Sequence, residues 1–218
     1  MLQHSWFVER EIMKNSPVHL FVFEGMADWE AAFAVTCINH PRFQENPGRY
    51  GVRTAARSLA PIRTMGGLRI MPDMTIDEVC PAESSMLILP GGDAWEAGGN
   101  LEALERAHAF ILAGVPVAAI CAATLALARV GLLDNRLHTS NDSTYLAASG
   151  YRGNHFYCDV PAINGGNVIT ASGLAPIEFA REIAKLLHLY APSTLDAWYS
   201  LYKHGGSSKF YEFAAQPA

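Results

Sequence analysis

Short apolar runs alternate along this chain with segments of helical periodicity. The clearest runs are VHLFVF at 18–23, SMLILP at 85–90 and VPVAAI at 115–120. Runs that are apolar at consecutive positions are typical of strands buried on both faces, as in a parallel sheet. The segments YGVRTAA at 50–56 and NVITA at 167–171 predict further strands of the same sheet.

Segments with helical spacing of apolar residues fill the intervals between these strands. The first predicted helix covers 27–39, and Asp28 is a candidate for its N-cap. Similar spacing predicts helices at 101–113, 121–133 and 176–190.

Two weaker patterns complete the set of predicted elements. The segment 61–72 holds Gly66 and Gly67 between two short extended pieces, which predicts a hairpin. The segment RLHTSN at 136–141 predicts a late strand.

The alternation of strands and helices predicts an α/β fold with a mostly parallel sheet flanked by helices. We expect one such domain at 17–191, preceded by an N-terminal extension at 1–16. An aromatic tail at 192–218 is expected to pack on the domain or on a partner. Ligands of such sheets usually bind at the carboxyl ends of the strands.

Composition narrows the setting in which the protein works. The formal net charge is −5 and no basic block occurs, so nucleic acid is not an expected partner. No apolar run reaches the roughly 18 residues of a membrane span, and the first residues lack the apolar region of a signal peptide. The four cysteines are scattered without metal-site spacing, which leaves disulfides open and favours a reducing, cytoplasmic location.

Cys121 is the main candidate for chemistry. It lies between a predicted strand and a predicted helix, so its sulfur would sit at a helix N-terminus, where free N–H groups stabilise a thiolate. We therefore expect a lowered thiol pKa. The small residues Ala122 and Ala123 permit a tight turn, and the Ala122 amide is a candidate oxyanion donor. A buried structural cysteine fits the same pattern.

Two further segments end at the same predicted edge of the sheet. Gly91 and Gly92 follow a buried strand, and either amide is a candidate oxyanion donor, although an ordinary glycine turn has the same sequence. Glu30 lies early in the first helix. Burial and a neighbouring thiolate would raise its pKa, so that it could donate a hydrogen bond to sulfur or carry a proton. A solvent-facing glutamate is the alternative.

The segments GMADWE at 25–30, LILPGGD at 87–93 and AICAAT at 119–124 occur in the order and spacing of the ThiJ/PfpI family. The chain resembles that family over 18–189 and is most similar to a bacterial subgroup with the ADWE and ICAAT forms. The resemblance implies a flavodoxin-like α/β sandwich related to class I glutamine amidotransferases.

The resemblance also implies roles for individual residues. The nucleophile-elbow cysteine of the family falls on Cys121, and the acidic residue that hydrogen-bonds it falls on Glu30. The glycine after the LPG strand falls on Gly92, and the amide after the cysteine on Ala122.

The histidine base of the family's proteases and amidotransferases has no clear counterpart. Ala122 stands directly after the cysteine, and His188 lacks the acidic residue of a His-x-Glu pair. His138 is the candidate at a third family position, and a shift of one or two residues would place Ser140 or Asn141 there instead. Glutaminase and peptidase activity are therefore expected to be absent or marginal.

Two hypotheses about function follow from these residues. In the first, the protein is a cysteine-dependent enzyme acting on a small electrophile such as a reactive carbonyl, with glyoxalase- or hydrolase-like chemistry and no metal or organic cofactor. In the second, it is a redox-responsive or chaperone-like stress protein that uses oxidation of Cys121. The family resemblance and the aromatic residues also predict a homodimer.

Overall fold

A seven-stranded sheet forms the centre of the protein in a computed structural model that describes residues 16–217. Its strand order is β5-β2-β1-β6-β7-β9-β8, and β8 alone runs antiparallel to its neighbour β9. The predicted mostly parallel sheet is confirmed. The strands are β1 (Val18–Phe21), β2 (Val52–Ala56), β5 (Met74–Thr75), β6 (Met86–Leu89), β7 (Val117–Ile120), β8 (Ala162–Asn164) and β9 (Val168–Ala171).

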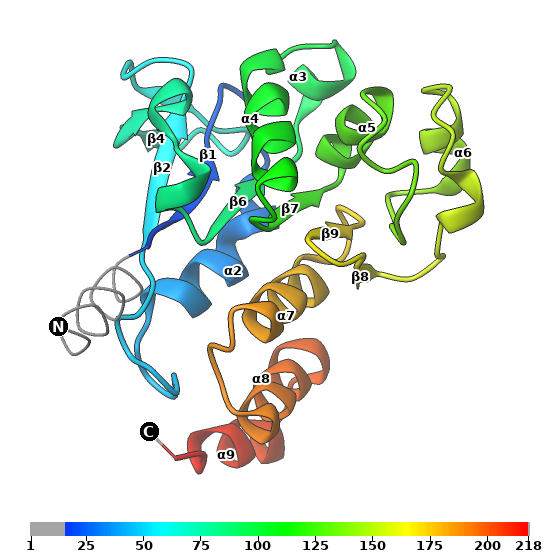
Figure 1. Cartoon of the computed structure of the whole chain (residues 1–218). Helices are drawn as coiled ribbons and strands as arrows, with labels where there is room; N and C mark the ends of the chain where they lie inside the picture. The colour runs from blue at the N-terminus through cyan, green and yellow to red at the C-terminus, as the bar shows by residue number, and fades with distance from the viewer. Residues whose placement is uncertain (1–15, 218) are drawn as a thin grey trace, which may run out of the picture.

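Helices cover both faces of this sheet. Figure 1 shows α4 and α5 on one face and α2 and α7 on the other, with α8 and α9 packed outside α7. The described helices are α2 (Asp28–Asn39), α3 (Asp93–Glu96), α4 (Leu101–Leu112), α5 (Ala122–Arg129), α6 (Ser143–Ala147), α7 (Pro176–Leu186), α8 (Pro192–His204) and α9 (Ser207–Ala214). Short 3-10 turns lie at Ile76–Glu78, Pro81–Glu83 and Asn154–Phe156.

The order of the strands reverses between β1 and β6. These strands are neighbours, but the chain continues from β1 to β2 on one side and from β6 to β7 on the other. Such a reversal leaves a crevice at the carboxyl ends of the strands. The segments after β1, β6 and β7 therefore meet at one edge, as the sequence predicted.

The predicted hairpin is confirmed as the antiparallel pair β3 (Ile62–Arg63) and β4 (Arg69–Ile70). Asp28, however, is not the N-cap of α2, because that position is occupied by Ala27. The Asp28 carboxylate instead accepts hydrogen bonds from the Thr64 hydroxyl at 2.5 Å and from the Gly66 amide at 2.6 Å. It therefore ties the hairpin to the start of α2.

The predicted strand at 136–141 is wrong. Only an isolated bridge between His138 and Tyr157 forms there. Side chains replace the ladder at the next two positions, because the Thr139 amide donates to the Thr170 hydroxyl and Ser140 shares a hydrogen bond with Thr124. Residues 138–140 are buried without belonging to the sheet.

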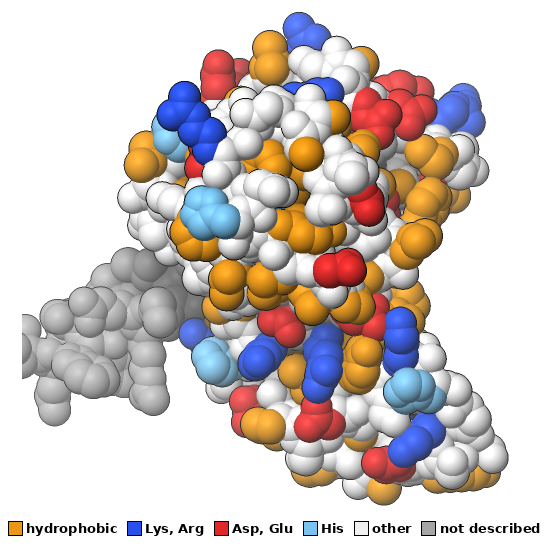
Figure 2. All heavy atoms as spheres, turned by 90° about the vertical axis from the view of Figure 1, so that its right-hand side faces the viewer, with side chains coloured by type: hydrophobic (Ala, Val, Ile, Leu, Met, Phe, Trp, Pro, Cys, Tyr) orange, Lys and Arg blue, Asp and Glu red, His pale blue; other side chains and the backbone are white. Residues whose placement is uncertain are grey.

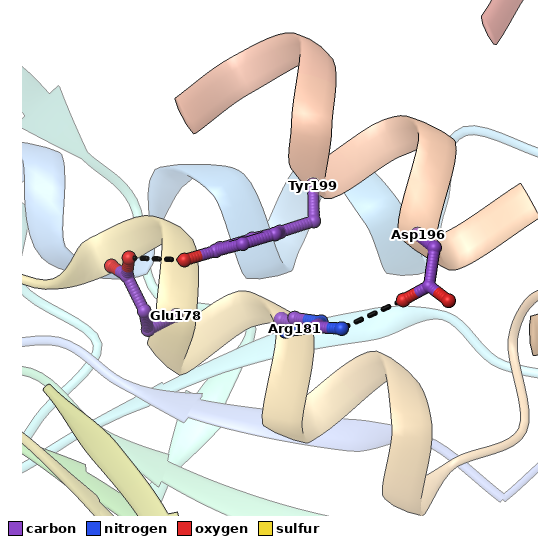
Figure 3. Close-up of polar contacts among 4 residues, drawn as sticks. All are labelled: Glu178, Arg181, Asp196 and Tyr199. Carbon is purple, nitrogen blue, oxygen red and sulfur yellow. Dashed lines mark hydrogen bonds and ion pairs between the residues drawn. The ribbon is translucent and has the colours of Figure 1, made fainter. Parts of the chain in front are cut away.

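Side-chain contacts join α8 to α7, as Figure 3 shows. The Tyr199 hydroxyl donates to the Glu178 carboxylate at 2.9 Å, and Arg181 pairs with Asp196 at 2.7 Å. Lys203 adds an ion pair with Glu178 at 2.8 Å, and the Arg181 guanidinium lies 4.3 Å from the centre of the Tyr199 ring. These contacts dock the C-terminal segment on the domain.

Aromatic rings reinforce this docking. The Trp198 and Tyr202 rings contact Phe33 of α2, with centroids 6.3 and 5.3 Å apart, and Phe213 of α9 lies 4.6 Å from Phe43. Figure 2 shows hydrophobic side chains across the middle of the face it presents and charges of both signs on its lower part. Residues 192–217 thus pack on the α/β domain through hydrogen bonds, ion pairs and aromatic contacts.

None of the helices that the structure describes is long and apolar enough to span a bilayer. All four cysteines lie in the described part of the chain and are free thiols.

The helix α5 should be essential to stability because residues 122–128 are all buried. Leu127 is fully buried, whereas Leu112, at the end of α4, is 75% exposed. We expect Leu127→Ala to lower the free energy of unfolding by about 2–5 kcal/mol. The matched Leu112→Ala should change it by less than about 0.5 kcal/mol. Urea denaturation of both variants checks this, and equal losses would contradict the role of α5 in the core.

Candidate active site

Cys121 occupies a sharp turn between β7 and α5. Its backbone has φ 58° and ψ −129°, a conformation that residues with a side chain rarely adopt. Hydrogen bonds hold it there: the Cys121 amide donates to the Ala171 carbonyl at 3.0 Å, and its own carbonyl accepts from the Thr124 amide at 3.0 Å. The sequence-predicted strand-to-helix turn is confirmed, and the turn leaves the Cys121 side chain only partly buried.

Glu30 reaches the sulfur from the first turn of α2. The residue is 1% exposed, and its Oε2 atom accepts a hydrogen bond from the Gly91 amide at 2.5 Å. Its carboxyl group is also in hydrogen-bond contact with the Cys121 side chain. The structure thus brings together two of the predicted residues, and the solvent-facing alternative for Glu30 does not hold.

The backbones of two glycines lie close to the Cys121 sulfur. A Cβ atom on Gly91 would lie 3.1 Å from the Cys121 sulfur and 2.7 Å from Glu30 Oε2. A Cβ atom on Gly173, in the loop after β9, would lie 2.8 Å from the same sulfur. Side chains at either position would displace the Cys121 side chain, so both glycines are needed for this close approach.

His138 does not contact Cys121, which corrects its candidacy as a catalytic residue. Its ring nitrogens are engaged by the Arg136 carbonyl at 2.8 Å and the Tyr151 hydroxyl at 3.0 Å, and burial lowers the pKa of its imidazole. Asn141, the register alternative, contacts the sulfur instead, with Nδ2 at 3.4 Å. The missing strand at 136–141 explains the error, because strand alternation does not apply there.

The pKa values of Glu30 and Cys121 differ in part from the sequence-based expectation. Burial raises the pKa of Glu30 to about 7, as predicted in direction. Burial, followed by the charge of Glu30, raises the pKa of the Cys121 thiol to about 11, so the expected low thiol pKa is wrong. Groups in such contact titrate as a pair, which loses one proton near pH 7 and the second near pH 11. Over a wide pH range the negative charge of the pair therefore rests mainly on the Glu30 carboxylate, and the thiol keeps its proton.

The three candidate oxyanion donors are not equivalent. The Gly91 amide is committed to Glu30, which corrects its role as a free donor. The Ala122 amide points to the Cys121 sulfur. Gly92, with φ 154°, is the N-cap of α3, and a Cβ there would lie 2.8 Å from the Gly25 carbonyl oxygen.

Sequence reasoning missed Gly173 and Trp29. The Trp29 indole N–H donates to the Gly173 carbonyl at 3.2 Å, and the Gly173 amide donates to Asn141 Oδ1 at 2.8 Å. A sequence signal existed for Gly173, which follows the predicted buried strand NVITA after one serine. Gly91 follows its own buried strand in a similar way.

The fold and site define a class of α/β proteins with a cysteine on a strained strand-to-helix turn and an acidic partner from the helix after the first strand of the sheet. The chain belongs to the DJ-1/PfpI family, whose family description matches residues 16–186.

Relatives with known sequences or structures agree with this membership. "Uncharacterized protease YoaZ" of Bacillus subtilis is 39% identical over 203 residues, covering 92% of this chain and 97% of that protein. "Deglycase PfpI" of Pyrococcus furiosus is 41% identical over 75 residues, covering 34% of this chain and 45% of that protein. A crystal structure of a thiJ/pfpI family protein from Bacillus anthracis matches with a TM-score of 0.87 and 38% identity, covering 94% and 98% of the two chains.

Replacing Glu30 with glutamine should lower the pKa of Cys121. The substitution removes the negative charge that raises this pKa, while the glutamine oxygen can still accept from Gly91. For each pH unit by which the thiol pKa falls, iodoacetamide should alkylate Cys121 about threefold faster below that pKa, because more thiolate outweighs its lower nucleophilicity. Mass spectrometry of the modified peptide against pH measures this. The exposed Glu105→Gln serves as control, and an unchanged profile in Glu30→Gln would remove Glu30 as the partner.

Gly173→Ala should slow alkylation of Cys121 because its new Cβ would lie 2.8 Å from the sulfur. Gly51→Ala is the matched control, since a Cβ at Gly51 meets nothing within 4 Å. We expect at least about a tenfold loss of rate for Gly173→Ala, the cost of about 1.4 kcal/mol of strain on the reactive geometry. Equal rates in the two variants would show that the glycine is not required there.

Proposed function

We propose that this protein is a cysteine-dependent enzyme that acts on a small electrophile, with reactive aldehydes as the substrate class. The observation that carries the proposal is the contact between the Cys121 sulfur, on its strained turn, and the buried Glu30 carboxyl. A carboxyl group with a pKa of about 7 is suited to exchanging protons with substrate at neutral pH.

The first step is addition of the thiol to the aldehyde. The sulfur forms a bond to the carbonyl carbon, Glu30 takes the thiol proton, and the carbonyl oxygen becomes an oxyanion that then receives that proton. Amides at Gly92 and Ala122 are the proposed donors to this oxygen. The product is a hemithioacetal on Cys121.

A 2-oxoaldehyde can go further without any added oxidant. The Glu30 carboxylate removes the proton from the carbon bound to sulfur and returns it to the neighbouring carbonyl carbon, while the hydroxyl proton of the hemithioacetal moves to the oxygen of that carbonyl. This isomerisation gives a thioester of a 2-hydroxy acid, and water then hydrolyses the thioester and frees the thiol. The net reaction adds one water to the oxoaldehyde.

Steric and chemical features favour aldehydes over amides. The backbones of Gly91 and Gly173 approach the sulfur closely, and this short distance suits a small planar carbonyl. Peptide and glutamine hydrolysis also require protonation of an amine leaving group, and neither Ala122 nor His138 supplies a base beside the sulfur. The names protease and deglycase of two relatives agree with hydrolase-like chemistry in general.

Turnover of methylglyoxal by wild type should rise with pH through about 7, because the carboxylate form of Glu30 is the base. Cys121→Ser and Glu30→Gln should lose at least about a hundredfold in kcat/KM, the lower end of the range for acid–base groups. Lactate formation measures the reaction, and glutamine and casein serve as substrates that should not be hydrolysed. Absence of turnover together with ready oxidation of Cys121 by peroxide would favour the redox-responsive alternative.

We also propose that the protein forms a homodimer. Exposed aromatic side chains on α2, α8 and α9, namely Trp29, Tyr202, Phe210 and Tyr211, support this proposal. Light scattering at micromolar concentration should give twice the 23.7 kDa of one chain. A species of one chain alone would rule the dimer out.

A further inference from the structure

Trp29 and Glu30 are adjacent in the first turn of α2, and both reach the surroundings of Cys121. Glu30 is buried and contacts the sulfur directly. Trp29 is 49% exposed, yet its indole N–H donates to the Gly173 carbonyl at 3.2 Å. A tryptophan has one hydrogen-bond donor, and Trp29 uses it on a loop backbone although its ring is half-exposed. This contact suggests a role other than packing.

Gly173 is held from two sides by these contacts. Its carbonyl accepts from Trp29, and its amide donates to Asn141 Oδ1 at 2.8 Å. Between the two bonds its Cα faces the sulfur, since a Cβ there would lie 2.8 Å from Sγ. The loop position is therefore set by Trp29 on one side and Asn141 on the other.

The Gly173 amide decides which way the Asn141 side chain points. A backbone N–H can only donate, so the carbonyl oxygen of the Asn141 side chain must face it. The side-chain NH2 group then faces Cys121, with Nδ2 3.4 Å from the sulfur. Without the Gly173 amide, the opposite orientation would place an oxygen lone pair against the sulfur and repel a thiolate.

We propose that Trp29 is a positioning residue that, through Gly173, holds the Asn141 NH2 group on the Cys121 sulfur and so stabilises the thiolate. This inference rests on Cys121 as the reactive atom of the proposed function. Asn141 works against burial and the Glu30 charge, since its hydrogen bond lowers the pKa of a thiol that they raise. These hydrogen bonds place a donor on the Cys121 sulfur, which His138 does not do because its ring nitrogens are engaged elsewhere.

The test follows alkylation of Cys121 by iodoacetamide, which needs no turnover and so is separate from the proposed activity. Three variants are compared with wild type: Trp29→Phe, Asn141→Ala and the double variant. Phenylalanine keeps an aromatic ring at a half-exposed position and removes only the N–H donor. Tyr202→Phe on α8 is the matched control, since it removes a polar group from another aromatic residue, 46% exposed.

Asn141→Ala should raise the pKa of Cys121 and slow alkylation at pH 8, about threefold for each pH unit by which the thiol pKa rises. Trp29→Phe should slow it in the same direction, and the double variant should be no slower than Asn141→Ala, because both act through one hydrogen bond. Tyr202→Phe should match wild type. The proposal is overturned if Trp29→Phe alkylates like wild type, or if its effect persists undiminished in the Asn141→Ala background. Loss of methylglyoxal turnover alone would bear on the proposed function only.

Discussion

The contact between the Glu30 carboxyl and the Cys121 sulfur is the constraint on which the rest of the site depends. It requires the first turn of α2, the end of β6 and the turn after β7 to meet at one point, which the reversal of strand order between β1 and β6 provides. Gly91 serves this contact twice, because its amide fixes the carboxylate and its lack of a side chain leaves room for the sulfur. The turn at Cys121 is strained, and hydrogen bonds to Ala171 and Thr124 hold it in place.

Opposing effects act on the ionisation of the Cys121 thiol. The start of α5 and the Asn141 amide favour a thiolate, but a helix terminus is typically worth only about 0.3–1 kcal/mol at an accessible position. Burial and the nearby carboxylate disfavour it and prevail, so the thiol pKa rises while that of Glu30 also rises. A thiol beside a carboxylate can pass its proton to the carboxyl group without a change in the total charge of the pair.

The helices outside the sheet support this arrangement at a distance. The helix α2, which carries Trp29 and Glu30, packs against α7. The helix α8 contacts α2 through Phe33, and it contacts α7 through the ion pairs of Glu178 and Arg181. The hairpin β3–β4 is tied to the start of α2 by Asp28. The helix that carries the acidic partner is thus held by segments far away in the sequence.

The sequence by itself determined the parallel sheet, the hairpin and the elbow at Cys121, and it made Glu30 a candidate partner of the cysteine, because each depends on local periodicity or on a short motif. Only the tertiary structure decided which residues complete the site. His138 and Asn141 are three positions apart, and the choice between them depended on a segment that leaves the sheet, where side-chain hydrogen bonds of Thr139 and Ser140 replace the strand ladder. Gly173 and Trp29 meet across 144 positions of chain, a separation at which local pattern carries no information. The thiol pKa depended in the same way on burial and on a neighbouring charge, which arise only when distant segments are packed together.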